Sequence, residues 1–94
     1  MPPKTLTRAA ERKARLFGLF ADPTRLQILK FLSRHPKTSA GKIAKHVGMS
    51  AACTSHHLQL LKDNAVAECR REGNTIFYCL KKDKIVKTLV SLIN

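Results

Sequence analysis

A mainly α-helical domain with one β-hairpin is the fold class that this sequence predicts. Apolar residues recur at helical spacing in five stretches, four of which follow an Asp or Ser able to cap a helix. Two further segments flank Glu72-Gly73-Asn74 as the strands of a hairpin do. Of the 94 residues, 44% are hydrophobic, which suffices for one modest core, so residues 1–94 are expected to form a single domain.

The first two helices meet at Asp22-Pro23. The first is expected over residues 5–20, and the second starts at Asp22-Pro23, because Asp can accept exposed backbone N–H groups and proline loses no hydrogen bond in the first turn. The first helix has an apolar stripe comprising Leu6, Ala9, Ala10, Phe17 and Phe20. The second is apolar on most sides, which predicts the central core helix, through Leu26, Ile28, Leu29, Phe31 and Leu32.

A tight turn joins the next two helices. Ser39 can cap a short helix that ends at Gly48, since glycine tolerates the left-handed conformation of a helix C-terminus. Ser50 can cap the following helix, expected over residues 51–63. Two helices joined by three residues with a glycine are typical of a helix-turn-helix.

The chain closes with a hairpin and a helix. Segments 66–71 and 75–80 are expected to pair as a wing, and Asp83 to cap the last helix. That helix and the first one hold more apolar surface than one small core can cover, so a two-fold dimer is predicted through them, with Leu89 in the interface.

Several segments together resemble those of the ArsR/SmtB repressors. In order along the chain they are 22–29 (DPTRLQIL), 48–50 (GMS), 54–58 (TSHHL), 70–74 (RREGN) and 78–80 (YCL). The resemblance covers nearly the whole chain. It implies a homodimeric winged helix-turn-helix repressor, with helices and strands in the order α-α-α-α-β-β-α, that leaves its operator when an inducer binds.

The charge of the chain supports double-stranded DNA as the partner. Eighteen Lys and Arg against six acidic residues give a net charge of +12, which favours a polyanion. A helix fits the major groove, where the base edges differ between all four base pairs. The outer face of the 51–63 helix is therefore expected to contact DNA, with Ser55, His56 and Gln59 reading base edges and Ala52 on the same DNA-binding face. His57, beside Leu58 and Leu61, is expected inside the domain or at an interface instead.

Other polar residues are expected to hold the phosphate backbone and set the register of binding. Arg70 and Arg71 flank the hairpin tip, but alternation along a strand prevents both from facing the DNA alike. The remaining candidates lie on the preceding helix, at the next helix start and in the hairpin turn: Lys42, Lys45, Ser50 and Asn74.

The inducer cannot be identified from the residues, and no cofactor or metal is predicted. The segment 41–46 (GKIAKH) lacks the Cys-x-Cys pair of the family's arsenic and cadmium sensors, and the last helix lacks metal ligands beyond Asp83. Cys53 and His57 could supply two ligands of an incomplete site. Candidate redox thiols are Cys53, Cys69 and Cys79, against the alternative that all three are small apolar fillers.

The hairpin loop decides how two of the thiols lie. Cys69 and Cys79 oppose each other across the hairpin only if the loop comprises Gly73-Asn74-Thr75. A two-residue Gly73-Asn74 turn places them on opposite faces of the sheet.

The composition and the missing motifs also indicate where the protein is located and which classes of function it can have. No apolar stretch near the N-terminus is long enough for a signal peptide or membrane span, and the odd cysteines lack CxxC spacing, so a reduced, cytoplasmic, nucleoid-associated protein is expected. No paired catalytic carboxylates or Gly-rich phosphate loop indicate an enzyme. Two alternatives to a specific repressor remain: a sequence-indifferent architectural DNA-binding protein, and a winged-helix module for protein contacts.

Overall fold

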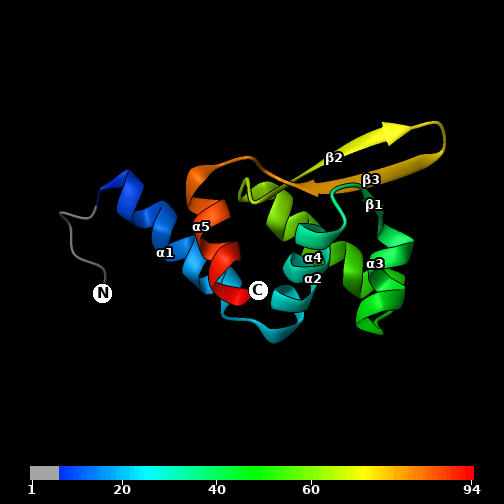
Figure 1. The fold of residues 1–94 in the computed structure, drawn as a ribbon, viewed down its shortest axis with the longest axis horizontal. Coiled ribbons are helices and arrows are strands. Elements are labelled where there is room, and N and C mark those ends of the chain that lie inside the picture. The colour runs from blue at the N-terminus through cyan, green and yellow to red at the C-terminus, as the bar shows by residue number, and fades with distance from the viewer. Residues whose placement is uncertain (1–6) are drawn as a thin grey trace.

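The computed structural model describes residues 7–94, which form five helices and a three-stranded antiparallel sheet (Figure 1). The helices are α1 Arg8–Phe20, α2 Pro23–Arg34, α3 Ala40–Val47, α4 Ala51–Asp63 and α5 Lys84–Ile93. The strands are β1 Thr38–Ser39, β2 Ala67–Glu72 and β3 Thr75–Leu80. The predicted mainly helical fold with one hairpin is confirmed, and β1 is an addition to the predicted order.

Helix boundaries follow the capping residues. Asp22, Ser39, Ser50 and Asp83 are the N-caps of α2, α3, α4 and α5, and each side chain accepts a backbone N–H two or three residues further on. Gly48 ends α3 with φ 69°, a left-handed conformation in which a Cβ is strained. The helix-turn-helix therefore forms where local chemistry predicts it.

The core lies where α2 is surrounded by the other helices and by the sheet. Ile28, Leu29 and Leu32 of α2 are completely or almost completely buried, as is Ile43 of α3. Figure 1 shows α1 and α5 side by side at one end of the molecule, with α3 and the hairpin tip at the other. Arg12 of α1 donates to the Asp83 carboxylate at the start of α5, over 2.9 Å.

The apolar stripe predicted for α1 is only partly correct. Thr7 caps a helix that starts at Arg8, and Leu6 lies outside the described residues. The buried residues of α1 are Leu16, Leu19 and Phe20, whereas Phe17 is 61% exposed. Consecutive helical residues point about 100° apart, so the residue after the buried Leu16, Phe17, points away from the core. Ala9 is exposed as well.

Strand β1, between α2 and α3, is not among the elements that the sequence predicts. Thr38 is only 3% exposed and pairs with Tyr78, while Ser39 pairs with Phe77. The sheet order is β1-β3-β2, so β3 is the central strand. A strand of two residues shows no alternation of apolar and polar residues, which is why no pattern in the sequence predicts it.

The hairpin turn comprises two residues, Gly73-Asn74, because Glu72 pairs with Thr75. Gly73 has φ 61°, as the first residue of such a turn requires. In this register Cys69 pairs with Tyr78, and Cys79 pairs with Glu68. The two thiols therefore lie on opposite faces of the sheet, which is the second of the two predicted arrangements.

Candidate DNA-binding surface

Helix α4 separates a buried face from an exposed one. Thr54, Leu58 and Leu61 are completely buried and fix the helix to the core. The three residues predicted to read bases, Ser55, His56 and Gln59, are exposed on the other side, and so is Ala52. The structure thus places these short or polar side chains together, on a helix of 13 residues held by its opposite face.

One member of the exposed face already has an intramolecular partner. The side-chain amide of Gln59 donates to the Asp63 carboxylate over 2.7 Å, one helical turn away. The carbonyl oxygen of the amide is not used in that bond and remains an acceptor. This bond orders the Gln59 side chain near the C-terminal end of the exposed face.

His57 belongs to the protein interior, as the sequence predicts. It is half-buried, and an Arg25 guanidinium nitrogen lies 3.4 Å from its Nδ1. The guanidinium can only donate, so Nδ1 is the acceptor in this contact. Arg25 also donates to the carbonyl oxygen of Leu19 over 3.0 Å. The positive charge of Arg25 disfavours a metal ion between Cys53 and His57. The spacing of residues in the sequence does not reveal this contact.

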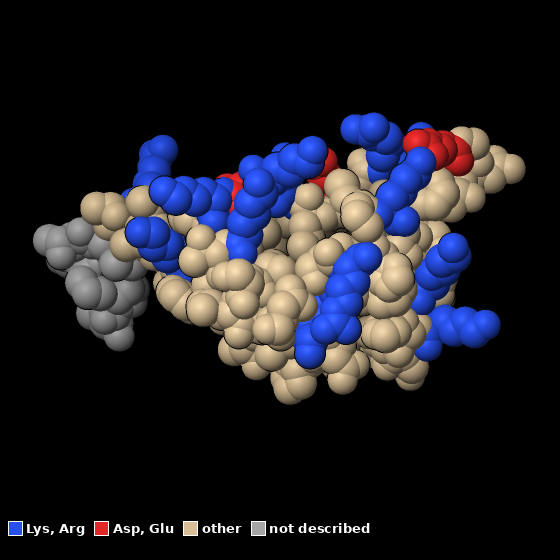
Figure 2. All heavy atoms as spheres, in the orientation of Figure 1, with Lys and Arg blue, Asp and Glu red and all other residues tan. Residues whose placement is uncertain are grey.

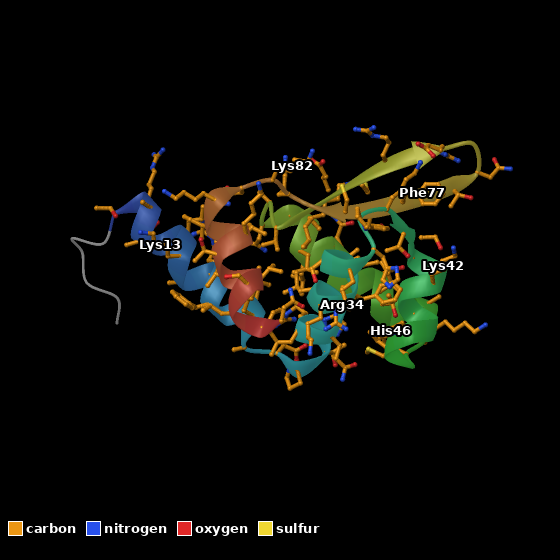
Figure 3. All side chains as sticks on the ribbon, in the orientation of Figure 1. Lys13, Arg34, Lys42, His46, Phe77 and Lys82 are labelled. Carbon is orange, nitrogen blue, oxygen red and sulfur yellow. The ribbon has the colours of Figure 1, made fainter. Side chains whose placement is uncertain are left out.

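Cationic side chains are exposed on α3, the helix that packs against α4. Lys42 and Lys45 project from α3 into solvent, and Figure 3 shows Lys42 at the end of the molecule that carries the wing tip. Ser50 is exposed at the start of α4, where its hydroxyl accepts the N–H of Cys53 over 3.1 Å. Its backbone N–H lies at the N-terminus of α4, which is the positive end of the helix dipole.

The two wing arginines lie on opposite faces of the hairpin. Arg71 pairs with Ile76, on the face whose inner part, at Ala67, packs against the core next to α4. Arg70 pairs with Phe77 on the other face, where it lines a cavity. Arg71 also donates to the carbonyl oxygen of Gly73 over 3.3 Å, which holds it beside the exposed turn. Alternation therefore separates the two predicted contacts, and Asn74 stands exposed in the turn.

The cysteines differ in environment. Cys53 is exposed near the start of α4, and Cys69 and Cys79 are half-buried on the wing. Burial, aided by a hydrogen bond from its thiol to the Glu68 carboxylate, raises the pKa of Cys79. This environment favours the unreactive thiol form at Cys79. Among residues 7–94, no group of three or more His, Cys, Asp and Glu side chains is placed to hold a metal ion.

Two apolar side chains at the α1 and α5 end are largely exposed. Phe17 of α1 is 61% exposed and Leu92 of α5 is 74% exposed. Leu89, predicted in the dimer interface, is instead 8% exposed and belongs to the protomer's own core. The helix phase explains the difference, because Leu92 lies about 300° round the axis from Leu89, displaced about 60° from the buried stripe.

None of the helices in the described part of the chain is both long enough and apolar enough to cross a membrane.

Residues 22–64, which include both helices of the helix-turn-helix, match the model of the bacterial regulatory protein arsR family.

Named relatives match over most of their length. The chain is 35% identical over 89 residues to the HTH-type transcriptional regulator YgaV of Escherichia coli, covering 95% of this chain and 90% of YgaV. It is 35% identical to the transcriptional repressor SdpR of Bacillus subtilis, covering 84% of this chain and 87% of SdpR.

A solved structure shares the fold. The homodimeric winged helix-turn-helix DNA-binding domain Mb0332 of Mycobacterium bovis, described as a possible ArsR-family regulator, superposes with a TM-score of 0.81 at 29% identity. The match covers 98% of this chain and 86% of that domain.

Proposed function

The chain belongs to the ArsR family of bacterial regulatory proteins, and on that premise we propose how this DNA-binding repressor, which is not an enzyme, reads and holds its operator. One observation carries the proposal. The exposed face of α4 presents short polar side chains, and the two elements that pack against α4, namely α3 and the wing strand β2, carry the exposed cations Lys42, Lys45 and Arg71. That arrangement fits a helix lying in the major groove with phosphates on either side.

Base recognition is assigned to the exposed face of α4. Ser55, His56 and Gln59 can exchange hydrogen bonds with base edges, and Ala52 offers a methyl group to a thymine methyl. Because Gln59 is tethered to Asp63, its free carbonyl oxygen favours a base-edge donor such as the adenine or cytosine amino group. His56 is exposed and unencumbered by the Arg25 contact that holds its neighbour His57.

Phosphate contacts are assigned to the residues around that face. Lys42 and Lys45 supply charge from α3, Ser50 supplies a backbone N–H at the α4 N-terminus, and Asn74 stands at the wing tip. Of the two wing arginines the geometry favours Arg71, because it shares the face of the hairpin that packs next to α4. These contacts position the protein without selecting a sequence.

We propose that the DNA-binding unit is a homodimer joined through α1 and α5, and that residues 1–94 constitute one domain. The exposed Phe17 and Leu92 supply the apolar surface for such contact, and the related domain Mb0332 is described as homodimeric. A two-fold dimer presents two α4 helices to half-sites about one helical turn apart, or a multiple of it. Binding of this kind places the protein at the nucleoid.

An operator-specific repressor is favoured over an architectural DNA-binding protein, because relatives that align over most of their length are named as transcriptional regulators and repressors. The two functions differ in a measurable ratio. Specific binding exceeds binding to unrelated DNA by at least about a thousandfold, whereas an architectural protein shows little difference.

The test is retention of a genomic fragment library on the purified protein in the presence of excess competitor DNA. Enrichment of a few fragments that share a two-fold sequence supports the proposal, and uniform retention of all fragments contradicts it. A variant with Ser55, His56 and Gln59 all replaced by Ala is the matched control, since these exposed changes leave the core intact. The variant should retain fragments without selection.

A further inference from the structure

A cavity of about 660 Å³ lies between the C-terminal end of α2, the sheet and α5. Its volume is within the range of small-molecule sites, about 300 to 1,000 Å³. The cavity is separate from both surfaces assigned above, since neither the base-reading residues of α4 nor Phe17 and Leu92 line it.

The interior of the cavity is mostly apolar. Leu32 of α2 and Val86 and Val90 of α5 form its base and are almost completely buried, and the partly exposed Phe77 of β3 contributes an aromatic ring. Figure 3 shows Phe77 on the hairpin strand nearest α3. An apolar wall of this kind accommodates the hydrocarbon body of a ligand by the hydrophobic effect.

The acidic residues of the cavity are already neutralised. Glu68 lies 3.4 Å from the ammonium of Lys81, and Glu72 is paired with Lys37. Lys37 also lies 4.8 Å from the centre of the Phe77 ring, so it covers that side of the cavity. The pairing with Lys81 is the main reason that the pKa of Glu68 is lowered, which keeps that carboxylate charged and occupied.

Three further cations line the cavity without an acidic partner in the described part of the chain: Arg70, Lys82 and Lys87. They come from the wing, from the segment after β3 and from α5, so they converge from different elements. Figure 2 shows Lys and Arg side chains bordering the tan surface between α5 and the wing, and Figure 3 labels Lys82 there. The cavity thus combines an apolar interior with an unneutralised positive rim.

We propose that this cavity binds an organic carboxylate with an apolar body, and that binding lowers the affinity of the protein for its operator. The carboxylate pairs with the cationic rim, where Arg70 can hold it through two parallel hydrogen bonds. The apolar body occupies the space lined by Leu32, Phe77 and Val90. The effect on the operator rests on the proposed function, whereas the binding site itself does not.

A short path joins the cavity to the DNA-binding helices. Phe77 lines the cavity and pairs through its backbone with Ser39 of β1. Ser39 is the N-cap of α3, and its hydroxyl accepts the backbone N–H of Lys42 over 3.3 Å. A ligand that shifts β3 therefore moves the start of α3, and with it a lysine assigned to phosphate.

The first experiment measures binding without DNA. The ¹⁵N-labelled protein is titrated with decanoate, with 2-naphthoate and with neutral decanol while amide chemical shifts are followed. Both carboxylates should shift amides of β3 and of residues 86–91, and decanol should bind at least about fivefold more weakly. Shifts centred on Phe17 and Leu92, no shifts at all, or equal affinity for decanol would overturn the proposal.

Variants then locate the charge contact. Arg70→Gln and Lys87→Gln should each weaken decanoate binding by about threefold to tenfold without changing decanol binding. Lys84→Gln is the matched control, because Lys84 is on α5 but outside the cavity, and it should bind decanoate as the wild type does. Ser91→Trp, at an exposed residue on the cavity wall, should block both ligands. Equal effects of Lys84→Gln and Lys87→Gln would contradict the assigned rim.

The second experiment adds an operator fragment recovered from the genomic library. Decanoate should reduce operator affinity at least about fivefold in the wild type and leave Ser91→Trp unaffected. Decanoate binding without a change in operator affinity refutes the coupling alone. Absence of any selected fragment refutes the proposed function and leaves the binding result standing.

Discussion

Replacement of one wing arginine should change how salt affects DNA binding, while replacement of its neighbour should not. Arg71 lies on the face of the hairpin next to α4, whereas Arg70 lines the cavity on the opposite face. Each phosphate contact contributes about 0.9 to the slope of log affinity against log salt. A dimer loses two contacts in Arg71→Ala, so the slope should fall by about 1.8.

This difference in slope between the wild type and Arg71→Ala corresponds to a large difference in how far salt weakens DNA binding. Between about 50 and 200 mM salt, wild-type binding should weaken about tenfold more than binding of Arg71→Ala. Fluorescence anisotropy with a labelled operator fragment, repeated at several salt concentrations, measures both slopes. Arg70→Ala is the matched control, and its slope should equal that of the wild type.

Two outcomes would refute this reasoning. Equal slope losses in Arg70→Ala and Arg71→Ala would show that the face of the hairpin does not decide which arginine meets the phosphates. A change of base preference in Arg71→Ala, measured with single-base variants of the operator, would assign that residue to base recognition instead.

Four further changes probe other parts of the molecule. His56→Ala should cost about 1 to 3 kcal/mol of discrimination at one base position in selection from random DNA; equal losses on every sequence would remove it from base recognition. Leu92→Lys should yield monomers by sedimentation, since that side chain is 74% exposed, and a stable dimer would contradict the interface. The buried hydroxyl of Thr54 has no hydrogen-bond partner among residues 7–94, so Thr54→Val should raise the free energy of unfolding in urea by about 1 kcal/mol, and a decrease would contradict this. The Arg12 guanidinium lowers the pKa of Asp83 below its ordinary value of 3.8. The stability that this pair contributes is therefore present above pH 3.8 and is lost as the pH falls through the lowered pKa. In an acid titration, Asp83→Asn should lack this loss of stability, and an unchanged acid transition would contradict the assignment.

Local chemistry predicted the helix-turn-helix almost completely. Ser39, Gly48 and Ser50 mark both ends of α3 and the start of α4, because capping and left-handed turns depend on a few neighbouring residues. The exposed face of α4 followed from the same 3.6-residue period that buries Thr54 and Leu58. The residues proposed to meet the DNA could therefore be chosen before the fold was known.

Features that depend on tertiary contact could not be predicted in the same way. Phe17 and Leu89 are both apolar residues of terminal helices, yet only Leu89 is buried, because the packing partner fixes which stripe faces inward. The contact between Arg25 and His57 joins residues 32 positions apart and leaves no local pattern. Arg70 and Arg71 were both candidate phosphate contacts until the register of the hairpin separated their faces.

The two-residue strand β1 has a role larger than its length. Its pairing with β3 attaches the loop before α3 to the central strand of the sheet, and Ser39 is both a member of that pair and the cap of α3. The wing and the helix-turn-helix are therefore connected by backbone hydrogen bonds as well as by the chain. Backbone ladders have discrete registers and yield little to gradual deformation, so a movement of β3 displaces α3 as a unit. In the proposed coupling, a ligand in the cavity that moves β3 would by this route displace Lys42 of α3, which is assigned to phosphate.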